Sequence, residues 1–205
     1  MSHATEQERF WAGGFGDGYI ARNRSATLVA AKTFLWANVL RRARLPASCV
    51  ELGANIGLNL VALRRLFPAM ELCGVEINAD AHAELSRLDG VAAIHASLLD
   101  WTPDRVRELS FTAGVLIHLD PGVLPRAYDA LHAASSRYIA VIEYYNPTPV
   151  EIPYRGHAGK LFKRDFAGEM LDRHRDLALV DYGFCWKRDA NWSLDDLTWF
   201  LLEKR

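Results

Sequence analysis

The sequence has few cysteines and no excess of either charge. Its three cysteines, Cys49, Cys73 and Cys185, lie in apolar runs and show no paired spacing. Such a pattern indicates buried, reduced thiols rather than a disulfide framework. The 24 basic residues nearly balance the 25 acidic ones, for a formal net charge of −1. No global basic field therefore favours nucleic acid as a partner, and no acidic tail indicates disorder.

Long apolar runs, internal repeats and low-complexity segments are also absent from the sequence. No apolar run approaches the roughly 20 residues that cross a bilayer, and the opening MSHATEQERF is too polar for a secretory signal. We therefore expect a cytoplasmic protein that binds neither a membrane nor nucleic acid. The chain has 205 residues and is 50% hydrophobic, which suits one domain, residues 1–205, with a sizeable core.

Apolar strand patterns alternate with helical patterns through the first 145 residues. Helices are expected over residues 25–43, where Ser25 can cap, and over residues 103–109, which begin with Pro103. This order predicts an α/β fold with a doubly wound, mostly parallel sheet. The last two strand patterns, LALVDYGFCW and DLTWFLLEKR, have no helix between them. The prediction is a Rossmann-like, seven-stranded sheet that ends in an antiparallel hairpin at one edge.

The first strand-to-helix turn, ELGANIG, lacks the third glycine of a dinucleotide fingerprint. Gly53 permits the tight turn, and Gly57 lets the backbone approach a ligand and the helix pack closely on the strand. The next strand ends at Glu76, 23 positions after Gly53 (76 − 53). An acid at about this spacing can accept both hydroxyls of a ribose.

Glu51, immediately before the turn, favours one class of cofactor. A carboxylate there would repel a pyrophosphate but attract an ammonium or a sulfonium. S-adenosylmethionine carries both cations and offers a ribose to Glu76, so we predict this cofactor rather than NAD. A tight turn without a ligand is the alternative. The residues expected at the cofactor in these segments are Glu51, Gly53, Ala54, Asn55, Gly57, Glu76 and Ile77.

Two later strand ends complete the expected cofactor site. Ser97 and Leu98 follow the third strand, where a hydroxyl or amide and an apolar side chain can hold an adenine edge; an ordinary loop is the alternative. Thr112 and Gly114 lie at the end of the fourth strand, where they would run under the methionine end of the cofactor. His118, just past this strand tip, has the intrinsic pKa of a general base, although a structural histidine would fit the same position.

These features resemble class I S-adenosylmethionine-dependent methyltransferases over nearly the whole chain. A narrower similarity, to the pseudaminic acid biosynthesis-associated methylases, rests on TEQERFWAGGFGDGYIARN, ELGANIGLN, GVLIHL, EYYNPTPVEIPYRGHAGKLFKRDFAGEM and DDLTWFLLEKR. The resemblance implies methyl transfer in sugar biosynthesis, with S-adenosylhomocysteine as product, and does not name the acceptor. The Asn55-Ile56 step departs from the commoner superfamily pattern, and the narrower family shares that departure.

A proline- and glycine-rich segment, residues 146–163, interrupts the strand-helix order and is expected to be a functional insertion on the acceptor side. Residues 154–164 hold four Arg and Lys side chains and no acid. We therefore predict a small anionic acceptor such as a sugar acid, a sugar nucleotide, a phosphate or a phosphonate, methylated on oxygen in preference to nitrogen. A solvated loop is the alternative. The expected acceptor residues are Tyr144, Tyr154, Arg155, His157, Lys160, Lys163 and Arg164.

The N-terminal segment, residues 1–24, is rich in glycine and aromatic residues. We expect it to form a lid in which Trp11, Tyr19 and Asn23 contact the cofactor, with plain packing on the core as the alternative. Two rival functions remain: an NAD-dependent oxidoreductase, and a non-catalytic cofactor-binding protein of a sugar-assembly pathway. We expect no metal site, and no residue pattern specifies the oligomeric state.

Overall fold

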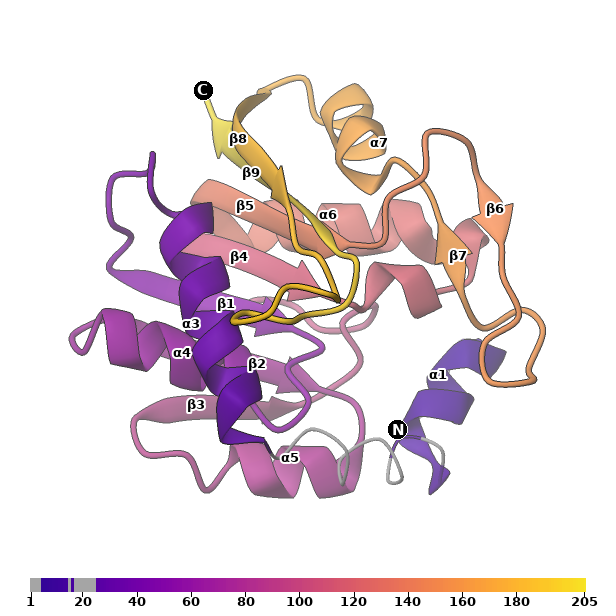
Figure 1. The fold of residues 1–205 in the computed structure, drawn as a ribbon, viewed down its shortest axis with the longest axis horizontal. Helices are drawn as coiled ribbons and strands as arrows, with labels where there is room; N and C mark the ends of the chain where they lie inside the picture. Colours follow the sequence, from indigo (N-terminus) through magenta and orange to yellow (C-terminus); the bar gives the residue numbers. More distant parts are fainter. Residues whose placement is uncertain (1–4, 15, 17–24) are drawn as a thin grey trace.

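A seven-stranded sheet runs through the computed structural model, which describes residues 5–14, 16 and 25–205 (Figure 1). The strand order is β3-β2-β1-β4-β5-β9-β8. Strands β1 to β5 pair in parallel, and β9 is antiparallel to both β5 and β8. The predicted α/β fold and its antiparallel edge are therefore confirmed. The strands are β1 (Ser48–Leu52), β2 (Glu71–Glu76), β3 (Val91–His95), β4 (Arg107–Ala113), β5 (Ser135–Glu143), β8 (Leu177–Phe184) and β9 (Thr198–Lys204).

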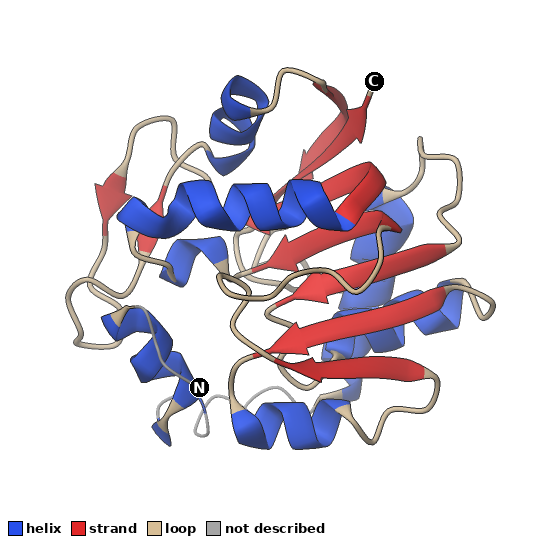
Figure 2. Cartoon of the chain, turned by 180° about the vertical axis from the view of Figure 1, so that it is seen from behind, coloured by secondary structure: helices blue, strands red, loops and turns tan. Residues whose placement is uncertain are grey.

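Helices cover both faces of this sheet (Figures 1 and 2). One core layer includes α3 (Ala26–Val39), α4 (Leu58–Leu66) and α5 (Ala79–Leu85), and the other includes α6 (Leu124–Ala134) and α7 (Phe166–Arg173). Because both faces are covered, β1 is buried along nearly its whole length, as its apolar sequence requires. No helix among the described residues is long and apolar enough to span a membrane.

The start of α3 agrees with the sequence, whereas the region before and after β4 does not. Ser25 caps α3 by accepting a hydrogen bond from the Thr27 amide at 3.2 Å. The helix predicted over residues 103–109 is wrong, because β4 already begins at Arg107. The buried Arg107 guanidinium is paired with Asp104 at 2.9 Å, and a helix this short has little intrinsic stability to oppose strand pairing. At its other end β4 stops at Ala113, followed by Gly114 at φ 71°.

The segment predicted as an insertion forms a small appendage beside the N-terminal helix. It contains a two-stranded sheet, β6 (Val150–Glu151) and β7 (Phe162–Lys163). Helix α1 (Glu6–Ala12) lies next to the loop between these strands and away from the central sheet (Figure 1). Thr5 and Glu8 form a reciprocal capping box at its start, with both hydrogen bonds at 3.1 Å.

Candidate functional site

A cleft opens outside the carboxyl ends of β1, β2 and β4, where the strand order reverses and α/β folds bind ligands. It encloses about 1120 Å³ of space between atoms, its open mouth included, which is enough for a nucleotide-sized ligand. Helix α1 supplies part of the wall. The cleft brings together these residues predicted from the sequence: Trp11, Glu51, Gly53, Ala54, Asn55, Glu76, Ile77, Ser97, Leu98, Gly114 and His118.

The turn after β1 shows why a third glycine is not needed. Gly53, Asn55 and Gly57 all have positive φ, at 78°, 49° and 80°. A Cβ at Gly53 would lie 2.6 Å from Val115 Cγ2, so the first position requires glycine. Asn55 tolerates the left-handed conformation, and its Oδ1 accepts a hydrogen bond from the Ile56 amide at 2.7 Å. Asn55 therefore adopts the left-handed conformation that a glycine would otherwise provide at this position of the turn.

Glu76 is held rigidly at the end of β2. Its Oε2 accepts a hydrogen bond from the Asn55 amide at 2.7 Å, and its Oε1 accepts one from the Asn78 amide at 2.8 Å. Burial raises the pKa of Glu76, and the backbone N–H groups of Asn78, Asn55 and Ile77 oppose that shift. Each carboxylate oxygen keeps a further lone pair for a ligand hydroxyl. The geometry suits a ribose diol.

Glu51 places a buried carboxylate on the cleft wall. Its Oε1 accepts a hydrogen bond from Asn59 Nδ2 at 2.5 Å, while Oε2 has no hydrogen-bond partner in the described part of the chain. Burial raises the pKa of Glu51 to about 8, against the opposing effects of the Asn59 hydrogen bond and the Lys32 charge. A buried oxygen without a partner on a cleft wall is a strong acceptor for a ligand cation.

Lys32 and Asn59 were not predicted as site residues, although both line the cleft beside Glu51. Lys32 Nζ donates a hydrogen bond to Asn59 Oδ1 at 3.0 Å, so the amide of Asn59 bridges the ammonium and the carboxylate. Lys32 is the one charged residue in the helical stretch 26–39. A single charge inside an otherwise apolar helix was the signal that could have identified it.

Three predicted cofactor residues make contacts within the protein. The Ser97 hydroxyl lies on the wall but donates its proton to Glu8 of α1. Thr112 does not line the cleft, because its Oγ1 donates to Glu143 Oε1 at 2.8 Å behind the wall. Gly57 does not line it either: a Cβ there would lie 2.5 Å from Leu88 Cδ1, so this glycine serves packing against the α5 region.

His118 is a buried, oriented imidazole. Its Nδ1 lies 2.6 Å from the carbonyl oxygen of Lys160. Because a carbonyl only accepts, Nδ1 carries the proton, and Nε2 keeps the lone pair in the neutral ring. Burial lowers the pKa of His118 to about 4, so the ring is neutral at pH 7. The rings of Trp11 and Tyr154 contact it, with centroids at 4.5 and 4.9 Å.

Glu143, at the end of β5, organises the turn that carries His118 and was missed in the sequence. Its carboxylate is buried and accepts hydrogen bonds from the backbone N–H groups of residues 115–117. Burial raises its pKa to about 7, which those N–H groups and a hydroxyl oppose. The sequence feature that could have identified Glu143 is its position, as an acid at the end of an apolar strand. The donors are Thr112 Oγ1 (2.8 Å), Val115 N (3.0 Å), Leu116 N (3.1 Å) and Ile117 N (3.4 Å).

None of the seven predicted acceptor residues lines the cleft. Two of the four cations are paired with acids, one from the distant helix α1 and one from helix α7, which follows directly in the sequence. Buried Lys160 Nζ lies 2.6 Å from Glu6 Oε1 of α1, and Arg164 Nε lies 2.7 Å from Glu169 Oε1 of α7. Residues 154–164 hold four cations and no acid, but acids outside this window pair with two of the cations; Arg155 and Lys163 form no ion pair with the described residues.

The other acceptor-side residues surround a tight hairpin. Arg155 and Gly156 both have positive φ, at 49° and 85°, and Tyr154 and His157 exchange backbone hydrogen bonds at 2.8 and 2.9 Å. This is the geometry of a two-residue β-hairpin turn. Arg155 lies 5.7 Å from the centre of the Tyr154 ring, and Lys163 lies 5.0 Å from that of Tyr144. Tyr19 and Asn23 lie outside the described residues.

Helix α1 connects the two sides of the cleft. On the acceptor side, Gln7 Nε2 donates to the Gly159 carbonyl at 3.1 Å, next to the Lys160–Glu6 pair. On the cofactor side, Asn78 Nδ2 donates to the Trp11 carbonyl at 3.2 Å. A ligand in the cleft would therefore lie between α1 and the strand ends.

Neither a family model nor a curated protein matches the sequence. Solved methyltransferase structures do match the fold. A mitomycin 7-O-methyltransferase superposes with a TM-score of 0.70 and 14% identity over 99% of this chain, which spans 62% of that protein. A Burkholderia thailandensis 1,6-didemethyltoxoflavin-N1-methyltransferase, solved with bound 1,6-didemethyltoxoflavin and S-adenosylhomocysteine, has a TM-score of 0.71 and 14% identity. The match covers 96% of this chain and 86% of that one.

A plantazolicin methyltransferase in complex with a desmethyl substrate analogue and S-adenosylhomocysteine is also similar. It has a TM-score of 0.64 and 12% identity, and the match covers 97% of this chain and 94% of that one. At such identities the similarity concerns the fold. The chain has the class I methyltransferase fold, and its narrower resemblance to the pseudaminic acid-associated methylases stays a prediction.

Proposed function

We propose that the chain is an S-adenosylmethionine-dependent methyltransferase. The observation that carries this proposal is Glu51, a buried carboxylate whose Oε2 has no partner among the described residues, on the wall of the cleft. In its ionised form, which a ligand cation stabilises, this carboxylate attracts an ammonium or sulfonium and repels the pyrophosphate of NAD. The class I methyltransferase fold of the chain supports the same cofactor.

The residues present fit this cofactor. Glu76 would hold the ribose hydroxyls, Glu51 the cationic methionine end, and Leu98 an edge of the adenine. When bound, the cofactor supplies an electrophilic methyl group. Gly53, at the start of the turn after β1, lines the cleft, so its backbone would lie against the ligand. Tyr19 and Asn23 remain predicted contacts of the methionine carboxylate.

His118 is proposed to accept a proton from the acceptor. Its Nδ1–H bond to the Lys160 carbonyl fixes the tautomer and stabilises positive charge as it develops on the ring. The low pKa of the free site keeps Nε2 available as a base at neutral pH. Trp11 and Tyr154 pack against the ring and exclude water from it. Positioning of the acceptor supplies the remainder of the rate enhancement.

The proposed acceptor is a small anionic molecule with a hydroxyl, such as a sugar acid, a sugar nucleotide, or a phosphate or phosphonate compound, in cytoplasmic sugar biosynthesis. Arg155 and Lys163 support it, because neither forms an ion pair with the described residues. A hydroxyl is favoured over an amine because His118 offers a base, and only a hydroxyl acceptor must lose its proton as it attacks.

A search for a methylated product tests this function. The protein and S-adenosylmethionine are incubated with a panel of acidic sugars, their nucleotides and phosphonates, and mass spectrometry follows the gain of one methyl group. We expect a product that wild type forms and His118→Gln does not. Binding of the cofactor without transfer to any panel member would favour a non-catalytic protein instead.

A further inference from the structure

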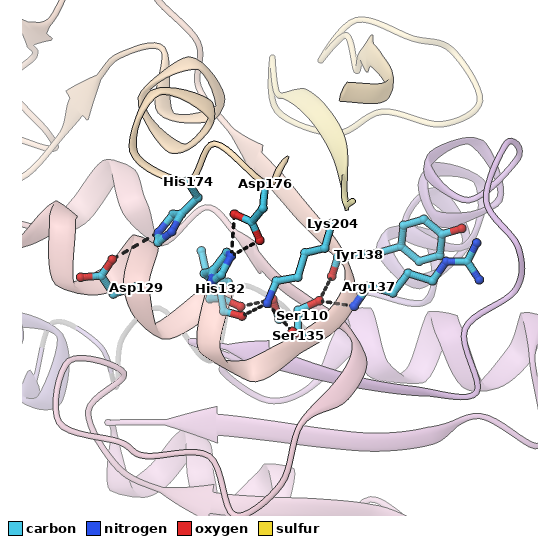
Figure 3. A network of polar contacts seen from close by, with 10 residues as sticks. Ser110, Asp129, His132, Ser135, Arg137, Tyr138, His174, Asp176 and Lys204 are labelled. Atoms are coloured by element: carbon cyan, nitrogen blue, oxygen red, sulfur yellow. Dashed lines mark hydrogen bonds and ion pairs between the residues drawn. The ribbon is translucent and has the colours of Figure 1, made fainter. Parts of the chain in front are cut away.

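A second group of polar side chains lies at the end of the sheet opposite the cleft (Figure 3). His132 comes from the last turn of α6, just before β5, and Asp176 stands directly before β8. Strands β5 and β8 run in the same direction, because both are antiparallel to β9. The group therefore lies at the amino ends of these strands, whereas the cleft lies at carboxyl ends.

The donor atoms of His132, His174 and Asp176 all lie within 4.8 Å of one another. His132 Nε2 is 2.9 Å from Asp176 Oδ2, and the two imidazole rings are stacked with centroids 4.1 Å apart. Figure 3 shows Asp176 on the His132 side of the stack and Asp129 on the His174 side. In the described part of the chain, this is the one group of three or more histidine, cysteine and carboxylate donors so close together.

Two imidazole nitrogens and a carboxylate oxygen form a donor set for a borderline divalent cation. Zn²⁺ binds such ligands at about 2.0–2.2 Å, which places tetrahedral donors about 3.4 Å apart. The widest donor pair must therefore close by at most about 1.4 Å, and one ring must tilt so that the two lone pairs converge. The side chains of His132 and Asp176 are 25% and 45% exposed, which leaves them room to turn and leaves a fourth position for water.

We propose that His132, His174 and Asp176 bind Zn²⁺ or a similar divalent transition-metal ion. Mg²⁺ and Ca²⁺ are disfavoured because they require oxygen ligands, and this set offers two nitrogens. The ion would tie the end of α6 to the start of β8, two segments 44 residues apart in the sequence. Its distance from the cleft makes the site structural, so it acts on stability and not on turnover.

Neighbouring charges orient this site and moderate its affinity. Asp129 lies 3.2 Å from His174 Nε2 and is itself held by Arg173 through two contacts of 2.6 Å. It can therefore orient the His174 ring, as outer carboxylates do in metal centres. Lys204 donates to the carbonyls of His132 and Ser135 at 2.6 Å. The positive charges of Arg173 and Lys204 oppose a cation and weaken its binding.

Metal titration of tag-free protein tests the site. We expect ZnCl₂ to raise the melting temperature by about 5–10 °C at 100 times its dissociation constant. CoCl₂ should give a visible tetrahedral absorption band that saturates at one ion per chain. His132→Gln and Asp176→Asn should each abolish both signals. His132→Gln could reduce the stability of the metal-free protein and so obscure the result. Asp176→Asn changes a half-exposed side chain and should fold normally, so its loss of both signals would still report the missing ligand.

A second stacked histidine pair in the chain supplies the matched control. The ring centroids of His82 and His95 are 4.9 Å apart, and the ring planes are 21° from parallel. This pair has no third donor in reach among the described residues. His82→Gln should leave both metal signals unchanged. The proposal is overturned if wild type shows no one-to-one binding, or if the signals survive in His132→Gln and Asp176→Asn. S-adenosylhomocysteine affinity, measured in parallel, tests the proposed function separately.

Discussion

The cofactor wall of the cleft and the acceptor-side segment beside it differ in the kind of contact that holds their charged side chains. Glu76 is fixed by amides of Asn55 and Asn78, within the same two strand-turn units. Lys160 and Arg164, in contrast, are neutralised by Glu6 and Glu169 from separate helices. Backbone N–H groups of turns thus hold the carboxylate of the first region, whereas side-chain ion pairs decide which charges of the second region are available to a ligand.

The largest expected effect is at His118, where the two sides meet. His118→Gln removes the proposed base while keeping a polar side chain of similar size. We expect kcat to fall by about 10²–10⁴-fold, with S-adenosylhomocysteine affinity within a factor of about two of wild type. Steady-state kinetics on the acceptor found by mass spectrometry measures the first quantity, and calorimetry the second. A variant with wild-type kcat would make His118 a structural residue.

Glu76→Ala tests the cofactor side alone. Loss of two charged hydrogen bonds to a ribose should weaken S-adenosylhomocysteine binding by about 100-fold in calorimetry. Glu71→Ala, at the exposed opposite end of the same strand, is the matched control and should bind normally. Equal affinities for wild type and Glu76→Ala would refute the ribose assignment.

Arg155→Ala and Lys163→Ala test the acceptor side alone. Each should raise the KM for an anionic acceptor by about tenfold, because each removes a cation that forms no ion pair within the described chain. Cofactor affinity should stay unchanged. Arg87→Ala, at an exposed site on the cofactor half, should leave both quantities at wild-type values. If KM for the acceptor does not rise in either variant, the anion-binding role of this loop is lost.

The smallest expected effect is a pH dependence of cofactor binding. The pKa of Glu51 is raised to about 8 in the free site, so the carboxyl is largely protonated below that pH. A bound cation favours the ionised form and lowers this pKa, so affinity should rise as pH increases, by about tenfold between about pH 6.5 and 8.5. Glu51→Gln cannot ionise and should bind weakly with little slope. If calorimetry shows the same change of affinity with pH for wild type and Glu51→Gln, the pH dependence belongs to another group.

The fold and most of the cofactor wall could be predicted because strand and turn chemistry is local. Gly53, Glu51 and Glu76 follow from their positions at strand ends. Lys32 was not placed at the site, since packing of α3 against α4 brings it beside Asn59, which contacts Glu51. The same holds for Glu143, whose partners lie on the neighbouring strand β4 and in the turn after it, and for Glu6, which is 154 residues from Lys160. Thr112 was misplaced because strand alternation turns its side chain toward Glu143.

We propose that the cleft selects a cation-bearing nucleoside over a pyrophosphate cofactor. Calorimetric titration of wild-type protein with S-adenosylhomocysteine and, separately, with NADH tests it most directly. We expect one-to-one binding of S-adenosylhomocysteine and no measurable binding of NADH. Tight binding of NADH, or failure of S-adenosylhomocysteine to bind, would contradict it.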